Sequence, residues 1–534
     1  MGKKIFINNR YNSFKKTITV DGDKSISIRA LLLGSQAYGK TFIENILLSE
    51  DIINSINCLR KLGVKISLNK KNCSIYGKGL NGFKYKKNIV LDAGNSGTFA
   101  RLILGLLTKS PYYIKLIGDK SLSRRDFERV ILPLQKIGAN FKMNNKKTLP
   151  LQIIGSNFIN PILYFENRGS AQCKSTVMLA ALNSPGETVI KAKKSRDHTE
   201  NFFKHLGIPI TIKKNKTNDE IKVKGQKIFR SFKYKVPSDP SSCAFFIVLT
   251  LLSKNCELKI KNVNVNPSRI GYIGILNKMG AKIKMMNIKK RYGEKHADIF
   301  VKSQPTLRRI SCPPSLNSSL IDEFLIIFLV AAKANGVSSF SNLEELNKKE
   351  SPRLKLGSKL LNQLGIRTKL TKDSIKIFGD PAINFRKSIN IENYYKDHRV
   401  FMTSVIAALT FGGKWKIDDI DSYKSSFPSF LKILKKLGYE FKFVWQFFND
   451  ICKKPLISTA DQLIAAWLIQ IKIPIAFIAI ININIIFIHD ILDTKSKSTI
   501  HRGRHSVRRG HSLSPDRPRT YRPNLPAASS SNGS

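Results

Sequence analysis

The chain has 534 residues, a length that excludes a single hydrophobic core and, at about 150 residues per domain, predicts roughly two to four folding units. Its composition, 42% hydrophobic and 24% charged, is typical of a soluble globular protein. The 91 Lys and Arg residues against 37 Asp and Glu give a net charge of +54, with lysines scattered through every segment. This spread favours a diffuse basic bias, with a smaller basic cleft for anionic substrates, over a dedicated nucleic-acid or membrane surface.

The cysteines and the first residues bear on location. The seven cysteines form no CxxC pair and no metal-ligand spacing, which indicates reduced thiols in a cytosol. The start of the chain, MGKKIFINNRYNSFKK, is basic but lacks the apolar segment of a secretory signal. We therefore expect a cytoplasmic protein without a metal site.

A short pattern recurs six times: the end of a helix, a glycine, and an alternating strand. It reads LRKLGVKISL from residue 59, LQKIGANFKM from 134, FKHLGIPITI from 203, LNKMGAKIKM from 276, LNQLGIRTKL from 361 and LKKLGYEFKF from 434. Successive glycines are 75, 69, 73, 85 and 73 residues apart. Glycine fits the left-handed residue that ends a helix, and the alternation after it predicts a strand. The sequence therefore predicts six small α/β units rather than the shorter coils of a solenoid.

The pattern ends near Phe443, and residues 446–534 differ in kind. Residues 456–492 are Ile-rich, and the uncharged run 473–488 has 16 residues, short of the roughly 20 that span a bilayer. From residue 495 the tail is rich in Arg, Ser and Pro, which predicts disorder. We interpret this tail as disordered or as a non-native extension. Its arginines leave nucleic-acid binding open as an alternative.

Three basic strings stand where turns enter helices: DGDKSISIR at residues 21–29, DAGNSGTFAR at 92–101 and GDKSLSRR at 118–125. Each combines hydroxyl and cationic side chains with a helix start, where free backbone N–H groups and the helix dipole attract anions. The first lacks the spacing of a Walker A loop. Together the three strings predict a phosphorylated or polycarboxylate substrate.

These strings resemble successive signatures of the shikimate enolpyruvyl transferases, the EPSP synthase family. Further strings follow in the family's order: SAQCKS at 170–175, SRDHTE at 195–200, PSDPSS at 237–242, NPSRIG at 266–271, LIDE at 320–323, KESPR at 349–353, DHR at 397–399 and SFP at 426–428. The resemblance covers about residues 1–445.

The resemblance implies an α/β (α+β) fold of two domains, with six βαβαββ repeats arranged three per domain around an inter-domain cleft. The six-fold repeat agrees with this number. The first domain would comprise residues 1–19 plus 235–445 and the second residues 20–234, with crossing strands near Val20 and Val236 as the hinge.

The implied reaction moves the enolpyruvyl group of phosphoenolpyruvate to the 5-hydroxyl of shikimate 3-phosphate and releases phosphate, in chorismate and aromatic amino acid biosynthesis. We expect a monomer that needs no cofactor. The methylene carbon is protonated while the hydroxyl adds, and the tetrahedral intermediate then loses phosphate. This chemistry needs cations for two phosphates and two carboxylates, a base for the hydroxyl and an acid for carbon.

The resemblance also assigns substrate contacts. For shikimate 3-phosphate they are Lys24, Ser25, Arg29, Ser170, Ala171, Gln172, Arg196, Asp322 and Lys349. For phosphoenolpyruvate they are Lys24, Asn95, Gly97, Arg125, Gln172, Arg353 and Arg399.

Three residues are expected to act in catalysis. Asp322 would accept the hydroxyl proton, Glu350 would relay a proton to and from the methylene carbon, and Lys24 would contact both substrates. Asp322 can alternatively serve only as a charge at the start of the helix FLIIFLVAAKA. His198 and His398 are expected to be structural hydrogen-bonding groups.

The sequence departs from the family pattern in a few places. Asp21 and Asp126 stand where Pro is usual, Ile28 where His or Asn is common, and Pro352 where Asp is usual. Ser425 occupies a position that is Lys in some members. None of these departures removes a charged catalytic candidate, but Ile28 and Pro352 bear on rate and affinity.

Two alternative functions stay open. A cell-wall enolpyruvyl transferase that acts on a UDP-sugar shares the fold, but it typically has Asn after the first Lys, where this chain has Ser25. A basic nucleic-acid-binding protein acting through the tail is the other, although no aromatic-interleaved basic stripe supports it.

Overall fold

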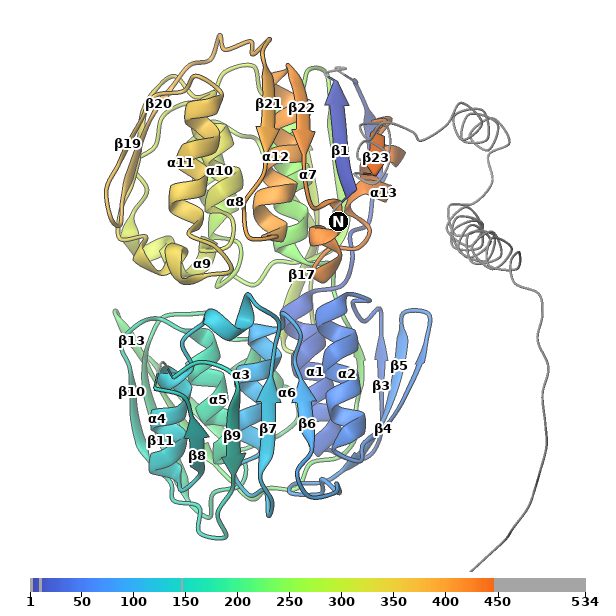
Figure 1. Ribbon diagram of the computed structural model, residues 1–534, viewed down its shortest axis with the longest axis vertical. Coiled ribbons are helices and arrows are strands. Elements are labelled where there is room, and N and C mark those ends of the chain that lie inside the picture. The colour runs from blue at the N-terminus through green and yellow to red at the C-terminus, as the bar shows by residue number, and fades with distance from the viewer. Residues whose placement is uncertain (1–2, 9–11, 146, 446–534) are drawn as a thin grey trace, which may run out of the picture. The chain divides into compact units, whose positions relative to one another are not determined.

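The computed structural model describes residues 3–8, 12–145 and 147–445, which lie within one compact unit spanning residues 1–450. The expected tail, residues 446–534, lies outside the described residues. Figure 1 shows the described chain as two lobes. One lobe carries the blue to green part of the chain, and the other carries the yellow to orange part together with the blue strand β1.

The first lobe holds three successive units of the same order. They are α1 (Lys24–Gln36), β3 (Tyr38–Glu44), α2 (Glu50–Lys61), β4 (Lys65–Asn69) and β5 (Asn72–Lys78); then β6 (Val90–Asp92), α3 (Gly97–Leu106), β7 (Ile114–Ile117), η1 (Leu122–Arg124), α4 (Glu128–Ile137), β8 (Asn140–Met143) and β9 (Leu151–Ile154); then β10 (Leu163–Glu166), α5 (Ala171–Ala181), β11 (Glu187–Lys193), α6 (His198–His205), β12 (Ile210–Lys214), β13 (Asn218–Lys224) and, returning to the first unit, β14 (Lys233–Lys235).

The second lobe repeats the order three more times. Its elements are β1 (Lys3–Asn8), β2 (Lys15–Ile18), α7 (Pro240–Leu252), β15 (Glu257–Asn264), α8 (Gly271–Lys278), β16 (Lys284–Arg291) and β17 (Glu294–Lys302); then η2 (Pro314–Leu316), α9 (Asn317–Leu320), α10 (Phe324–Ala332), β18 (Gly336–Phe340), η3 (Glu344–Lys348), α11 (Arg353–Gln363), β19 (Thr368–Leu370) and β20 (Ile375–Gly379); then β21 (Ser388–Ile391), α12 (His398–Phe411), β22 (Lys414–Ile417), η4 (Ile420–Ser425), α13 (Phe430–Lys436) and β23 (Lys442–Trp445).

The six sheets of the described chain share one topology. In the sheet β6-β7-β9-β8, the first pair is parallel and the next two pairs are antiparallel. Four other sheets repeat this order, and the three-stranded sheet β18-β20-β19 keeps its two antiparallel pairs. The predicted fold of six βαβαββ units is therefore confirmed.

Three strands belong to a sheet far from their place in the sequence. β1 lies between β22 and β23 in the sixth sheet, β2 is the parallel first strand beside β15, and β14 pairs in parallel with β3. The chain therefore passes between the lobes twice, and the two crossing segments form an antiparallel bridge at Gly22 and Ser238. The expected domain boundaries at residues 19/20 and 234/235 stay a prediction.

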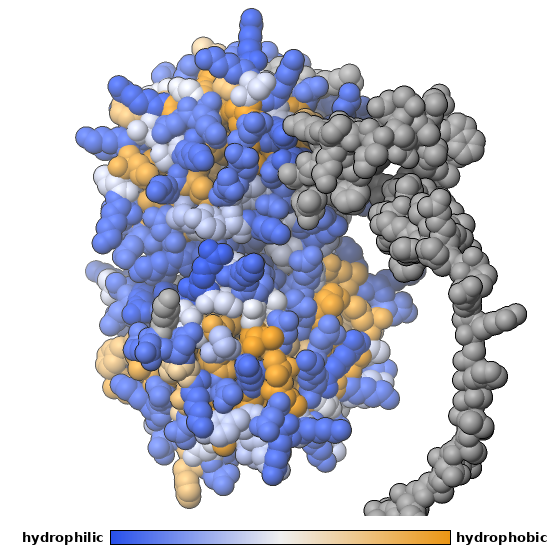
Figure 2. All heavy atoms as spheres, in the orientation of Figure 1, coloured by the Kyte–Doolittle hydropathy of each residue, from blue (hydrophilic) through white to orange (hydrophobic). Residues whose placement is uncertain are grey.

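The second lobe is built around two helices that are buried on all sides. Every residue of α7 and of α10 is buried, as expected for helices with no polar face. One hydrophobic core runs from Ile26 to Val236, and the other joins residues 5–20 to residues 243–439. Figure 2 shows one face of the molecule, where hydrophilic side chains alternate with smaller apolar areas.

The six repeated glycines adopt the backbone conformation that the sequence predicts. φ is 126° at Gly138, and between 67° and 99° at its five counterparts, each of which follows the second helix of a unit. An L side chain is strained in this region, so the glycines let each unit turn sharply from helix to strand.

No single helix among the described residues is both long and apolar enough to cross a membrane. The pair Pro314–Leu320 and Phe324–Ala332 meets the length and composition together, but it bends by 117° at its break.

Candidate active site

A cavity of about 810 Å³ opens between the lobes, and helix starts from both lobes reach it. The first residues of α1, α5, α11 and α12 line it, and the N-terminal ends of these helices carry partial positive charge. Twelve Lys and Arg residues line the cavity against five Asp and Glu. The cavity is therefore suited to a ligand with several negative charges.

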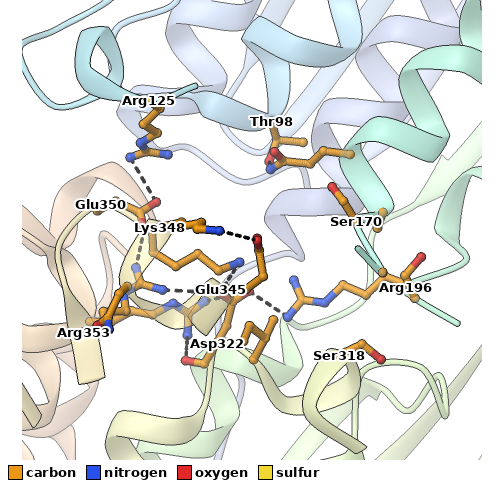
Figure 3. A pocket seen from close by; sticks show the side chains of 18 of the residues that line it. Thr98, Arg125, Ser170, Arg196, Ser318, Asp322, Glu345, Lys348, Glu350 and Arg353 are labelled. Atoms are coloured by element: carbon orange, nitrogen blue, oxygen red, sulfur yellow. Dashed lines mark hydrogen bonds and ion pairs between the residues drawn. The ribbon is translucent and has the colours of Figure 1, made fainter. Parts of the chain in front are cut away.

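Most of the expected site residues meet in this cavity. Those that line it are Lys24, Ser25, Arg125, Ser170, Ala171, Gln172, Arg196, Asp322, Lys349, Glu350, Arg353 and Arg399. Figure 3 shows the centre of the group, with Arg125, Glu350 and Arg353 on one side and Arg196 approaching Asp322 from the other.

Lys24 is the first residue of α1, at the crossing between the lobes. Asp23 caps the helix by accepting a hydrogen bond from the backbone N–H of Ile26. The backbone N–H of Lys24 donates to Asp239 across the crossing at 3.1 Å, and its Nζ lies 3.0 Å from Asp51. Lys24 is therefore fixed at its backbone while its ammonium group borders the cavity.

Asp322 precedes α10 and lies where four cations converge. Its carboxylate is 2.7 Å from Arg196, 3.4 Å from Arg353, 3.7 Å from Lys349 and 3.8 Å from Arg399. Burial alone raises the pKa of Asp322, but the four cations outweigh burial and hold the pKa well below its usual range. Asp322 is therefore ionised and able to accept a proton.

Glu350 joins the two lobes through arginines. It lies 3.2 Å from Arg125, which follows η1 in the first lobe, and 2.5 Å from Arg353, which begins α11 in the second. Burial opposes ionisation, but the charges of Arg125 and Arg353 hold the pKa of Glu350 well below its usual range. The carboxylate is therefore ionised when the site holds no substrate.

Arg353 connects both expected catalytic carboxylates to a helix cap. Its guanidinium is fully buried and donates to Asp397 through Nε at 2.9 Å, as well as reaching Asp322 and Glu350. Asp397 also caps α12 by accepting from the backbone N–H of Arg399 at 2.9 Å. One carboxylate thus orients two arginines expected to hold phosphoenolpyruvate.

A chain of hydrogen bonds forms the wall contributed by α3 and α5. Gln172 donates to Thr98 at 2.9 Å and accepts from Arg101 at 2.9 Å. Ser170 caps α5 by accepting from the backbone N–H of Cys173. The amide of Gln172 is thereby held in one orientation beside the cavity.

Three expected contacts do not line the cavity. Arg29 is buried within α1 and donates to Thr199, Ser175 and the carbonyl of Ser25. It therefore joins the first turn of α1 to α5 and α6. Asn95 accepts from Arg125 at 3.0 Å, and a side chain added at Gly97 would meet the Arg125 guanidinium at 2.8 Å. In this structure Asn95 and Gly97 position Arg125, and their expected direct roles stay predictions.

The sequence interpretation missed several cations of the cavity wall. Arg101, Arg129, Arg168 and Arg269 line it, although none was expected to contact a substrate. Arg129 forms an ion pair across the cavity with Glu345 at 3.3 Å. Arg129 lies four residues after Arg125 in the sequence RRDFER, and this nearby cation was the available signal.

The two histidines differ in environment. Burial lowers the pKa of His398 to about 3, so the ring is neutral beside the cavity. His198 is fully buried between Glu294 and Arg269.

The departures from the family pattern find local explanations. Ile28 is fully buried in the core of its lobe, and Pro352 is the N-cap position of α11 directly before Arg353. Asp21 accepts from Lys71 and from the backbone N–H of Ser429, and thereby links the crossing segment to both lobes.

The chain is similar to known proteins over most of its length. The family model described as EPSP synthase (3-phosphoshikimate 1-carboxyvinyltransferase) matches residues 9–434. The chain is 41% identical over 434 residues to the 3-phosphoshikimate 1-carboxyvinyltransferase of Ruthia magnifica subsp. Calyptogena magnifica, covering 81% of this chain and 98% of that protein. It is 38% identical over 432 residues to the enzyme of the same name from Syntrophomonas wolfei, covering 81% and 99%.

Solved structures are also similar to this chain. The EPSP synthase of Acinetobacter baumannii superposes with a TM-score of 0.73 at 33% identity, covering 83% of this chain and all of that one. The enolpyruvyl transferase NikO from Streptomyces tendae has a TM-score of 0.65 at 14% identity, covering 83% and 99%, which shows a likeness of fold.

Proposed function

Because the chain belongs to the EPSP synthase (3-phosphoshikimate 1-carboxyvinyltransferase) family, we propose that it transfers the enolpyruvyl group of phosphoenolpyruvate to the 5-hydroxyl of shikimate 3-phosphate and releases phosphate. The observation that carries the proposal is the cavity itself. Arginines and lysines from both lobes surround two ionised carboxylates there, Asp322 and Glu350. This arrangement supplies the cations, the base and the proton relay that the reaction needs.

The two substrates take different parts of the cavity. Shikimate 3-phosphate lies against the starts of α1 and α5 and against Arg196, where the 5-hydroxyl faces Asp322. Phosphoenolpyruvate lies among Arg125, Arg353 and Arg399. Lys24 stands between the two groups and contacts both substrates. The surrounding cations stabilise charge that develops on the phosphate as it leaves.

Asp322 acts as the general base. Its low pKa keeps it ionised, and the cation nearest to it, Arg196, comes from the opposite lobe. Removing the hydroxyl proton while the enol double bond is protonated is a general acid–base process, worth about 10²–10⁴ in rate.

Glu350 acts on the methylene carbon, and phosphoenolpyruvate itself controls its protonation. The anionic groups of phosphoenolpyruvate draw Arg125 and Arg353 away from Glu350 and add negative charge nearby. Both changes raise the pKa of Glu350, so that it takes up a proton when the donor substrate binds.

The test is phosphate release by the purified chain, with each substrate alone and with both. We expect release only with both, and expect Lys24→Met to abolish it. Lys136→Met, at an exposed lysine of α4, is the matched control and retains activity. No release from a folded chain would exclude the proposed function.

We also propose that the protein acts as a cytoplasmic monomer and that its basic surface binds no specific nucleic acid. Light scattering during size-exclusion chromatography tests whether the protein is a monomer. A gel-shift titration with duplex DNA at several salt concentrations tests for nucleic-acid binding, since non-specific binding weakens steeply with salt.

A further inference from the structure

Residues from four strings of the sequence meet at one buried arginine. Arg269, from the NPSRIG string, is 2% exposed and lies at the crossing between the lobes. Its guanidinium contacts Asp23, His198 and Asp239, which belong to the strings at residues 21–29, 195–200 and 237–242. These three residues are far apart in the chain, and only the fold brings them together.

Arg269 holds the caps of two helices at once. Nη1 donates to Asp23, the N-cap of α1, at 3.0 Å. Nη2 donates to Ser241 at 3.0 Å and lies 3.4 Å from Asp239, the N-cap of α7. Because α1 belongs to one lobe and α7 to the other, the guanidinium ties the two helix starts together.

These contacts fix the backbone at Lys24. The residue before it, Asp23, is bound to Arg269 through its side chain. The backbone N–H of Lys24 itself donates to the second oxygen of Asp239 at 3.1 Å. Both supports of the Lys24 backbone therefore depend on the same guanidinium.

A second branch of the network reaches Arg196. Since a guanidinium can only donate, Nε2 of His198 accepts from Arg269, and Nδ1 carries the proton that is donated to Glu294 at 2.7 Å. Asp197 accepts from Asn266, in the same turn as Arg269, at 2.7 Å. The segment that presents Arg196 to Asp322 is thus anchored to the other lobe.

We propose that Arg269 is a positioning residue, which places Lys24 for shikimate 3-phosphate by holding the caps of α1 and α7 together. This inference rests on the proposed role of Lys24 in substrate binding. A residue that only stabilised the fold would not act through Lys24, whereas a positioning residue loses its effect once the Lys24 ammonium is removed.

The experiment is a double-mutant cycle on the full chain, read as the dissociation constant of shikimate 3-phosphate by titration calorimetry. It uses Arg269→Gln, Lys24→Met and the double variant. We expect Arg269→Gln to weaken binding about tenfold in the presence of Lys24, and less than about threefold beside Lys24→Met. Arg60→Gln, whose guanidinium bonds to the carbonyl of Ile66 outside the cavity, leaves binding unchanged.

The outcomes distinguish the role of Lys24 from the role of Arg269. No effect of Lys24→Met alone would remove the proposed role of Lys24. A clear effect of Lys24→Met, together with equal weakening by Arg269→Gln in both backgrounds, would overturn the positioning role. Unchanged affinity in a folded Arg269→Gln variant would overturn it as well.

Arg269→Lys covers the case in which Arg269→Gln fails to fold. Lysine keeps the charge, but a single ammonium group lacks the planar fork that serves two carboxylates. The same cycle with Arg269→Lys decides the proposal by the same criteria, after circular dichroism has shown a native fold.

Discussion

The proposed role of Glu350 requires it to be protonated when phosphoenolpyruvate binds, yet its environment without substrate favours the ionised form. Its partners Arg125 and Arg353 are also the cations expected to hold the donor substrate. We therefore predict net proton uptake by Glu350 when phosphoenolpyruvate binds to the chain saturated with shikimate 3-phosphate. Titration calorimetry in two buffers with different ionisation enthalpies measures this uptake.

The matched control for proton uptake is Glu350→Gln, since phosphoenolpyruvate can exchange protons through its own phosphate. The Glu350→Gln variant should take up fewer protons on binding, and the difference between the two proteins is the uptake by Glu350. Equal uptake by both proteins would show that Glu350 keeps its ionised state, and that another group protonates the carbon.

Gly97 gives the Arg125 guanidinium its space. A methyl group added at Gly97 would lie 2.8 Å from Nη1 of Arg125 and 3.2 Å from Nη1 of Arg101. The flexible end of Arg125 has to move, which weakens a charge-assisted hydrogen bond worth about 1.5–3 kcal/mol. We predict that Gly97→Ala raises KM for phosphoenolpyruvate about tenfold or more, with KM for shikimate 3-phosphate nearly unchanged.

Steady-state kinetics with each substrate varied in turn checks the Gly97→Ala prediction. Gly274→Ala is the control, because the position lies in α8 with open space around it. A parallel rise of both KM values would mean that the methyl group disturbs the whole cavity rather than Arg125.

At the scale of elements, the start of α12 depends on a buried ion pair. Asp397 caps the helix and bonds to Arg353 at 2.9 Å and to Ser351 at 2.7 Å. Burial opposes ionisation, but Arg353 holds the pKa of Asp397 below its usual value. Removing one partner of such a pair costs about 3 kcal/mol.

Asp397→Asn is therefore predicted to lower the free energy of unfolding by about 3 kcal/mol at neutral pH. Because the folded pKa is depressed, this contribution is complete above the unfolded value of about 3.9 and disappears as pH falls through the folded value. Urea unfolding at pH 7 and pH 3 tests the sign. Asp421→Asn, at an exposed pair with Lys424, is the control, and an undiminished deficit at pH 3 would contradict the mechanism.

The sequence predicted the elements well because their signals are local. The glycine after each unit's second helix and the alternating strand beyond it need only about ten neighbouring residues to be recognised. The strings at residues 21–29 and 92–101 were predicted to enter helices, and α1 and α3 do begin there, with Asp23 and Ser96 as their caps. Local patterns therefore located most of the cavity wall.

Contacts between segments that are distant in the chain could not be predicted from local sequence patterns. Nothing in the string KKIFIN indicates that β1 would lie between β22 and β23, about 400 residues away. Arg269 shows no local sign that it joins Asp23 to Asp239, and Arg29 none that it donates to Thr199 and Ser175. These features depend on contacts between segments far apart in the chain, which only the assembled fold determines.

At the scale of the whole molecule, charge should govern how fast the substrates arrive. Twelve cations against five acids line the cavity, so its field attracts anions over distances that salt screens. We predict that kcat/KM for phosphoenolpyruvate falls roughly tenfold between about 0.05 M and 0.5 M salt. Arg168→Gln, at an exposed position of the cavity wall, should reduce this dependence without changing kcat. A salt dependence that the variant leaves unaltered would locate the effect elsewhere on the basic surface.

The last of the six sheets is complete at β23, before residues 446–534 begin. The last described strand, β23, pairs with β1 and completes the sixth sheet, and the residues that line the cavity all lie between positions 24 and 399. A chain ending at residue 450 therefore retains every element that the proposed reaction uses. We predict that it keeps kcat and both KM values within about twofold of the full chain, since it retains every residue that lines the cavity.

Thermal unfolding of the two chains, with shikimate 3-phosphate present and absent, completes the comparison. The substrate should raise the midpoint of both chains alike, because a ligand stabilises whichever protein binds it in the folded state. If DNA binding by the full chain disappears in the shortened one, the nucleic-acid alternative belongs to residues 451–534 alone. If instead phosphate release disappears, those residues contribute to the cavity, and the six units are not a sufficient enzyme.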